Sequence, residues 1–200
     1  MIFKTKFILA SSSQSRYDLL KKNKLSFIRI RPVCDENIIK KKLLKNKYSP
    51  KLISLELARL KAKSIGLKKI NKLVVGSDTV ISINGYLLDK AKNIKGARKT
   101  LLKMSNKEHS IYSSAAAFYN KKEIWHSTQK TIVKIRKISQ KEADIYLKNI
   151  GKKILNSVGC HRLEKEGPNI IENIKGDFFN VMGFPLFPFL LFLKEFNVEK

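Results

Sequence analysis

The sequence has few of the residues that build disulfide-rich proteins or flexible linkers. Only two cysteines, Cys34 and Cys160, occur in 200 residues, which excludes a disulfide framework. The five prolines and nine glycines are scattered, and no internal repeat is present, which argues against low-complexity segments and repeat arrays. Because 43% of the residues are hydrophobic, we expect one α/β domain over residues 1–200 with a substantial core.

Long hydrophobic runs are also absent. The apolar stretch at residues 7–10 is too short for the core of a signal peptide. The most apolar stretch, residues 184–196, is interrupted by Pro185, Pro188 and Lys194, and it is shorter than the roughly 20 residues of a membrane-spanning helix. We therefore expect a buried C-terminal helix, no membrane segment and a cytoplasmic protein.

Acidic residues are scarce: 16 Asp and Glu stand against 42 Lys and Arg, a formal net charge of +26. Such a charge attracts polyanions, so one hypothesis is a basic nucleic-acid-binding protein without enzymatic activity. The lysines are dispersed, however, without the interleaved aromatic residues of a base-stacking surface. We favour a solvated basic surface that attracts nucleotides, and nucleic-acid contact is the less favoured alternative.

The N-terminal residues have the pattern of a strand, a hydroxyl-rich loop and a helix. Residues 7–10 predict a short buried strand, and residues 14–22 predict a helix that Ser13 caps. Ser11, Ser13, Arg16 and the free amides of the first helical turn would then converge on an anion site. An ordinary capped helix with a solvated arginine is the alternative.

A polar Gly-Ser-Asp-Thr sequence interrupts the apolar, β-branched residues 73–81. An ionised Asp78 in a buried strand is costly unless it is paired, hydrogen-bonded or bound to a metal, and Gly76 allows backbone or ligand to approach closely. The alternative interpretation is a turn at a strand end, in which Asp78 caps local amides.

Other polar residues interrupt later elements in the same way. The pair Asp35-Glu36 follows a strand predicted over residues 27–33, and Lys61 lies in a helix predicted over residues 55–64. Such a lysine either extends to water, which is the default, or faces a phosphate. Asn84-Gly85 predicts a type I′ hairpin that returns Lys90 toward Asp78. Glu164, in the segment before a Gly167-Pro168 turn, is a further candidate acid.

The order of these segments and their local sequences resemble those of the Maf-like nucleoside triphosphate pyrophosphatase family over nearly the whole chain. The matching segments are residues 7–20, 34–36, 57–62, 76–80, 89–90, 109–113, 159–167 and 176–186. The resemblance implies a mixed central sheet flanked by helices, two lobes around a deep nucleotide cleft, and a homodimer. Gln14 and Ser15 replace a common proline and arginine, and Asp89 and Ala91 replace a glycine and proline, so phosphate contacts and loop shape differ there.

The activity that the resemblance implies is hydrolysis of a nucleoside triphosphate between its α and β phosphates, which removes unwanted nucleotides from the pool. The closing segment is more similar to the branch that acts on 7-methyl-GTP than to the branch that acts on dTTP and UTP. Asp78 is expected to be the general base or a metal ligand, and Glu36 and Glu164 are further catalytic or metal-binding carboxylates. The expected phosphate-binding groups are Lys61, Lys90, Arg16, Ser11 and Ser13.

Mg²⁺ is the expected cofactor, and Mn²⁺ or Co²⁺ can replace it because oxygen ligands at an open site select weakly among these ions. The alternative from another class is a nucleotide-binding regulator of cell division with little turnover. Three carboxylates disfavour that alternative, because uncompensated negative charges repel a triphosphate.

Overall fold

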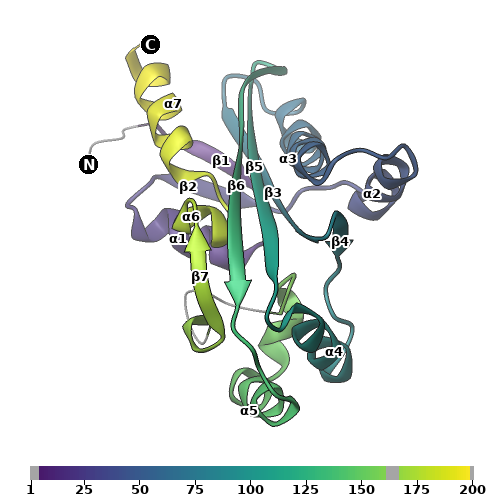
Figure 1. The fold of residues 1–200 in the computed structure, drawn as a ribbon. Coiled ribbons are helices and arrows are strands. Elements are labelled where there is room, and N and C mark those ends of the chain that lie inside the picture. The colour runs from purple at the N-terminus through teal and green to yellow at the C-terminus, as the bar shows by residue number, and fades with distance from the viewer. Residues whose placement is uncertain (1–4, 161–166, 199–200) are drawn as a thin grey trace.

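The protein is built around one mixed sheet of seven strands, seen in a computed structural model that describes residues 5–160 and 167–198 (Figure 1). The sheet order is β2-β1-β3-β5-β6-β7, and β4 pairs with β3. The strands are β1 (Phe7–Ala10), β2 (Phe27–Ile30), β3 (Leu73–Ile83), β4 (Tyr86–Leu88), β5 (Glu108–Tyr119), β6 (Lys122–Ile135) and β7 (Ile171–Lys175).

Helices flank this sheet, as the sequence predicts, so the mixed α/β class is confirmed. They are α1 (Gln14–Lys22), α2 (Glu36–Lys45), α3 (Pro50–Gly66), α4 (Ile94–Met104), α5 (Gln140–Ile150), α6 (Phe178–Val181) and α7 (Leu186–Val198). Two short 3₁₀ helices, η1 (Gly151–Asn156) and η2 (Gly167–Asn169), follow α5 and precede β7. No helix among the described residues is long and apolar enough to cross a membrane.

Strand β3 changes partners along its length. One edge pairs in parallel with β1 up to Gly76 and in antiparallel fashion with β4 from Ile81, while the other edge pairs with β5. Residues 77–80 therefore have no strand partner on the first edge within the described parts of the chain. We call this interval the β3 gap. Since β1 ends beside this gap, and the parallel β2 ends level with β1 on its other edge, the loops that follow both strands begin at this edge of the sheet.

The N-terminal prediction is confirmed. Strand β1 and helix α1 have the predicted bounds, and the Ser13 side chain accepts a hydrogen bond from the Arg16 backbone N–H. Helix α3 is longer than predicted, because Ser49 caps it and Pro50 occupies its first turn. Strand β2 is shorter than predicted and ends at Ile30.

Strand β3 runs without interruption through Gly-Ser-Asp-Thr, so the interpretation of these residues as a turn is wrong. Helix α3 packs so closely on β3 that a Cβ atom built on Gly76 would lie 2.3 Å from the Ala58 carbonyl oxygen. The same Cβ would lie 2.4 Å from the Ala62 nitrogen. Gly76 is therefore the residue that lets the α3 backbone approach the sheet, as its absent side chain suggested.

The predicted hairpin and C-terminal helix are both present. Asn84 and Gly85 have φ values of 50° and 81°, the left-handed pair of a type I′ turn, and Ile83 pairs with Tyr86 across it. Helix α7 buries Phe189 and Leu193 completely. It packs in one hydrophobic cluster with α1, β1 and β2, whereas a second cluster lies beneath α4 and α5.

Candidate active site

Three charged groups from different elements meet at the β3 gap. The Lys61 Nζ atom on α3 lies 2.6 Å from Asp78 Oδ1 on β3 and 2.9 Å from Glu36 Oε2 at the start of α2. The side chains of Lys61 and Asp78 are 9% and 12% exposed, whereas that of Glu36 is 42% exposed. Lys61 therefore does not extend to water, and the default expectation for it is wrong.

This arrangement compensates the buried charge of Asp78 and leaves part of it available. An ionised carboxylate in a low-dielectric environment is stable only with a close partner, and Lys61 provides one. The lysine contacts Oδ1, while Oδ2 has no hydrogen-bond partner among the described residues. Oδ2 can therefore accept a proton from a water molecule or bind a cation.

Arg16 lies on the other side of β3 from Lys61 and is almost completely buried. Its Nε donates to the Gly183 carbonyl oxygen at 2.8 Å, Nη1 to Ser11 Oγ at 2.7 Å and Nη2 to Thr79 Oγ1 at 3.2 Å. Burial lowers the pKa of Arg16, and the negative charges of Asp78 and Glu36 oppose that shift. The guanidinium thus connects the serine loop, the β3 gap and the turn before α7.

The segment that holds Gly183 in place is a part of the site that the sequence did not reveal. Asn180 on α6 is fully buried, and its Oδ1 accepts the Ser113 backbone N–H at 3.0 Å. The Ser113 hydroxyl donates to the Asn180 carbonyl at 2.8 Å and lies 2.9 Å from Thr79 Oγ1. Gly183 has φ 99°, which favours glycine. That glycine was the available signal, in a segment that the resemblance matched without a role.

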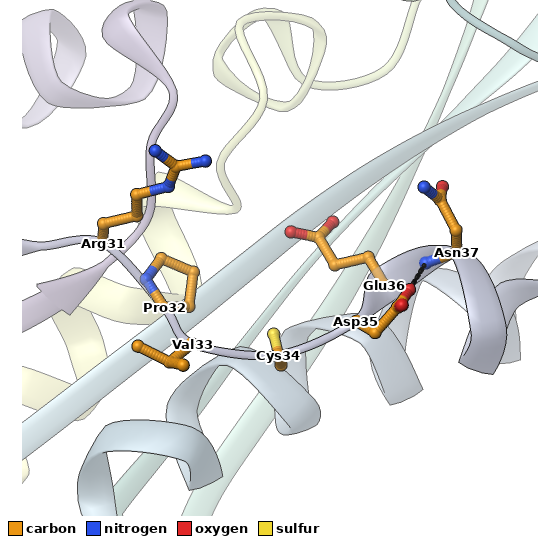
Figure 2. A pocket seen from close by; sticks show the side chains of 7 residues that line it. All are labelled: Arg31, Pro32, Val33, Cys34, Asp35, Glu36 and Asn37. Carbon is orange, nitrogen blue, oxygen red and sulfur yellow. Dashed lines mark hydrogen bonds between the residues drawn. The ribbon is translucent and has the colours of Figure 1, made fainter.

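The loop after β2 opens a pocket beside these groups. Figure 2 shows its lining, which consists of residues 31–37, and the pocket has a volume of about 910 Å³. Asp35 faces α2 and accepts the backbone N–H groups of Asn37 and Ile38, both at 3.0 Å. Of the acidic pair, Asp35 therefore caps the helix and Glu36 reaches Lys61. Arg31, at the other end of the loop, was not expected at the site.

Two predicted residues are not joined to this cluster. Lys90 follows β4, is exposed, and forms an isolated bridge with Val158. No ion pair between Lys90 and Asp78 is present in the described ranges, and the neighbouring Asp89 pairs with Lys40. Glu164 lies outside the described residues.

Neither cysteine has the properties of a nucleophile. Burial, with a smaller contribution from the Glu36 carboxylate, raises the pKa of the Cys34 thiol. Burial also raises the pKa of Cys160 to about 11. Because the thiolate is the reactive form, both side chains are neutral near pH 7. The site therefore favours water rather than a thiol as nucleophile.

The acidic groups fit a divalent cation that is shared with a phosphate ligand. No group of three His, Cys, Asp or Glu suited to hold a metal occurs among residues 5–160 and 167–198. Mg²⁺, however, commonly binds one or two carboxylates together with substrate phosphates and water. Asp78 Oδ2 and the half-exposed Glu36 supply that donor set.

Comparison with known proteins agrees with the resemblance seen in the sequence. The profile of the family described as "Maf-like protein" matches residues 6–196. The chain is 38% identical to the 7-methyl-GTP pyrophosphatase of Bartonella henselae over 191 residues, which is 96% of each chain. It is 33% identical to the nucleoside triphosphate pyrophosphatase of Caulobacter vibrioides over 190 residues, 95% of each chain. A matching profile over nearly the full length, with relatives of this identity, places the chain in the Maf family.

Proposed function

We propose that the protein is a nucleoside triphosphate pyrophosphatase that hydrolyses the α–β phosphoanhydride and releases a nucleoside monophosphate and pyrophosphate. The observation that carries this proposal is the contact of Lys61 with both Asp78 and Glu36 beside an open pocket. The relatives are named nucleoside triphosphate pyrophosphatase and 7-methyl-GTP pyrophosphatase, which supports the same reaction.

Each group has a role that follows from its position. A water molecule attacks the α-phosphorus, and its proton passes to Asp78 Oδ2. The bond from the α-phosphorus to the oxygen that bridges it to the β-phosphorus breaks, and pyrophosphate leaves. Lys61 holds Asp78 through Oδ1, which leaves Oδ2 toward the water, and it stabilises negative charge on the phosphates during the reaction. Arg16, Ser11 and the N-terminal amides of α1 orient the phosphates from the other side of β3.

Asp78 and Glu36 would hold a divalent cation, for which Mg²⁺ is the first candidate and Mn²⁺ or Co²⁺ the alternatives. When bound, such a cation neutralises phosphate charge and polarises the scissile bond. Lys90 and Glu164 remain predicted members of the site. We also propose a cytoplasmic homodimer, whereas contact of the basic surface with nucleic acid remains the less favoured alternative.

The substrate that we favour is 7-methyl-GTP. The sequence of the closing segment and the name of the Bartonella henselae relative both support this choice. Ordinary nucleoside triphosphates are the alternative, supported by the name of the Caulobacter vibrioides relative. A panel that contains both kinds of nucleotide therefore decides between them.

The test is pyrophosphate release from this panel, with and without Mg²⁺, by the wild type and by Asp78→Asn. We expect Asp78→Asn to lose about 10²–10⁴-fold in turnover, as is typical when a general base is removed. Asp144→Asn is a matched control, because Asp144 is an exposed residue of α5 that pairs with Arg98.

Near-normal turnover by folded Asp78→Asn would exclude the role assigned to this carboxylate. Absence of pyrophosphate release from every nucleotide by the wild type would overturn the proposed function and favour a nucleotide-binding regulator. Near-UV circular dichroism of each variant tests whether the fold is retained.

A further inference from the structure

Arg31 occupies a position from which it can reach a ligand at the β3 gap. It is the first residue after β2, which is parallel to β1, and Ile30 pairs with Ala10 at the ends of the two strands. The residue after Ala10 is Ser11, a hydrogen-bond partner of Arg16. The loops that begin at Arg31 and Ser11 therefore leave the sheet side by side.

The Arg31 side chain faces the same pocket as Glu36. Figure 2 shows the guanidinium of Arg31 and the carboxylate of Glu36 extending to the same side of the loop from its two ends. Glu36 is fixed by Lys61, so this end of the pocket adjoins the proposed reaction centre. Arg31 is exposed and has no ion-pair partner within the described residues.

The charged side chains of the site balance one another, so the charge of a bound triphosphate is left to the proposed divalent cation and to further basic groups. Arg16 and Lys61 carry two positive charges, and Asp78 and Glu36 carry two negative charges, so this group is neutral overall. A triphosphate has several negative charges, most of which lie on the β and γ phosphates that leave as pyrophosphate. An arginine presents paired N–H donors that match phosphate oxygens.

We infer that Arg31 is a further substrate-binding residue, which contacts the β,γ-diphosphate of the nucleotide. This inference rests on the proposed function and adds the group that holds the leaving pyrophosphate. Contact with the base is the competing assignment. It is disfavoured for 7-methyl-GTP, because the methyl group blocks the N7 acceptor that arginine uses on guanine and gives the base a positive charge.

The experiment compares inhibition by the two products in Arg31→Ala, Arg31→Lys and the wild type. Hydrogen bonds between charged groups contribute strongly to binding affinity. Arg31→Ala is therefore expected to raise the inhibition constant of pyrophosphate about 10- to 100-fold. The inhibition constant of the nucleoside monophosphate should stay within about 2-fold, because that product lacks the β and γ phosphates. Arg31→Lys should lie between the wild type and Arg31→Ala, because lysine retains the charge but not the paired donors.

The matched control is Lys148→Ala, which removes one positive charge from an exposed position on α5 without a change at the pocket. Equal effects of Arg31→Ala and Lys148→Ala would overturn the inference, since both would then reflect only the net charge. An equal rise in both inhibition constants in Arg31→Ala would also overturn it and would indicate contact with the nucleoside or the α-phosphate.

Calorimetric titration with magnesium pyrophosphate separates this inference from the proposed function. Weaker binding to Arg31→Ala than to Lys148→Ala supports the role of Arg31 whether or not the wild type hydrolyses a nucleotide. A wild type that binds pyrophosphate through Arg31 but hydrolyses no nucleotide would contradict the proposed function and leave the diphosphate contact in place. Indistinguishable binding by the two variants would refute the contact itself.

Discussion

Gly76→Ala is expected to destabilise the protein and to disturb the site at the same time. The added Cβ would lie 2.3 Å from the Ala58 carbonyl oxygen and 2.4 Å from the Ala62 nitrogen, both backbone atoms of α3. Ordinary van der Waals contact begins at 3.4 Å, so strand and helix would have to separate by roughly 1 Å. A flexible side chain could move aside, whereas a helix backbone cannot do so without repacking its whole buried face.

The magnitude follows from this clash. Overpacking a core by one methyl group commonly costs 1–3 kcal/mol, and a rigid backbone neighbour puts Gly76→Ala at about 3 kcal/mol. For a chain of this length each kcal/mol lowers Tm by about 2–4 °C, which gives a decrease of about 6–12 °C. Helix α3 also carries Lys61, which we propose as a phosphate-binding group, and a displacement of about 1 Å in an active site can reduce turnover by about 100-fold.

Urea denaturation and thermal unfolding measure the stability, and pyrophosphate release measures the activity. Gly96→Ala on α4 is the matched control, because its Cβ would meet Asn93 Oδ1 at 3.4 Å and Ala91 Cβ at 3.7 Å, which are tolerable contacts. Alanine has the higher helix propensity, so this control should gain about 0.5–1 kcal/mol. If Gly76→Ala were as stable as the wild type, close approach of α3 would not be the reason for glycine at this position.

Two further predictions concern ionised groups. Lys61→Ala should destabilise the protein by about 3–5 kcal/mol because it leaves Asp78 buried without a partner. Adding Asp78→Asn to Lys61→Ala should recover part of the lost free energy of unfolding, measured by urea denaturation. If the effects of the two substitutions on that free energy were strictly additive, the pairing of Lys61 with Asp78 would be contradicted. Hydrogen bonds, chiefly from Ser139 and Arg136, lower the pKa of Glu142 to about 2. The ionised Glu142 therefore stabilises the fold at pH values above 4.5, the ordinary pKa of glutamate. Glu142→Gln should therefore unfold at lower urea than the wild type at pH 7. This difference should narrow as the pH falls from 4.5 toward 2, and a difference independent of pH would contradict it.

The sequence predicted the elements that local signals define. Strand β1, helix α1 and the Asn84-Gly85 turn depend on burial pattern, a capping serine and left-handed residues, all of which are readable over a few positions. The start of α3 was missed although Ser49 and Pro50 are standard signals of a helix N-terminus.

The errors and omissions concern contacts between distant segments. Gly76 and Asp78 are compatible with either a turn or a buried strand, and the distinction depends on the packing of α3. The link from Arg16 to Gly183 joins residues 167 positions apart, and no local pattern encodes such a pairing. Arg31 was overlooked because the predicted strand over residues 27–33 included it, whereas β2 ends at Ile30, so Arg31 begins the loop beside the end of β1.

The position of the β3 gap explains how cations from both sides of the sheet can act on one ligand. Successive side chains of a strand point to opposite faces, so Gly76 and Asp78 face α3 and Lys61, while Ser77 and Thr79 face Gly183 and Arg16. A continuous neighbouring strand would separate the two faces. Because β1 ends at Ala10 and β4 begins only opposite Ile81, the edge of β3 is open between them, and both faces meet there. Asp78, the carboxylate that we propose as the general base, is therefore in the middle of the interval where no strand separates Lys61 from Arg16.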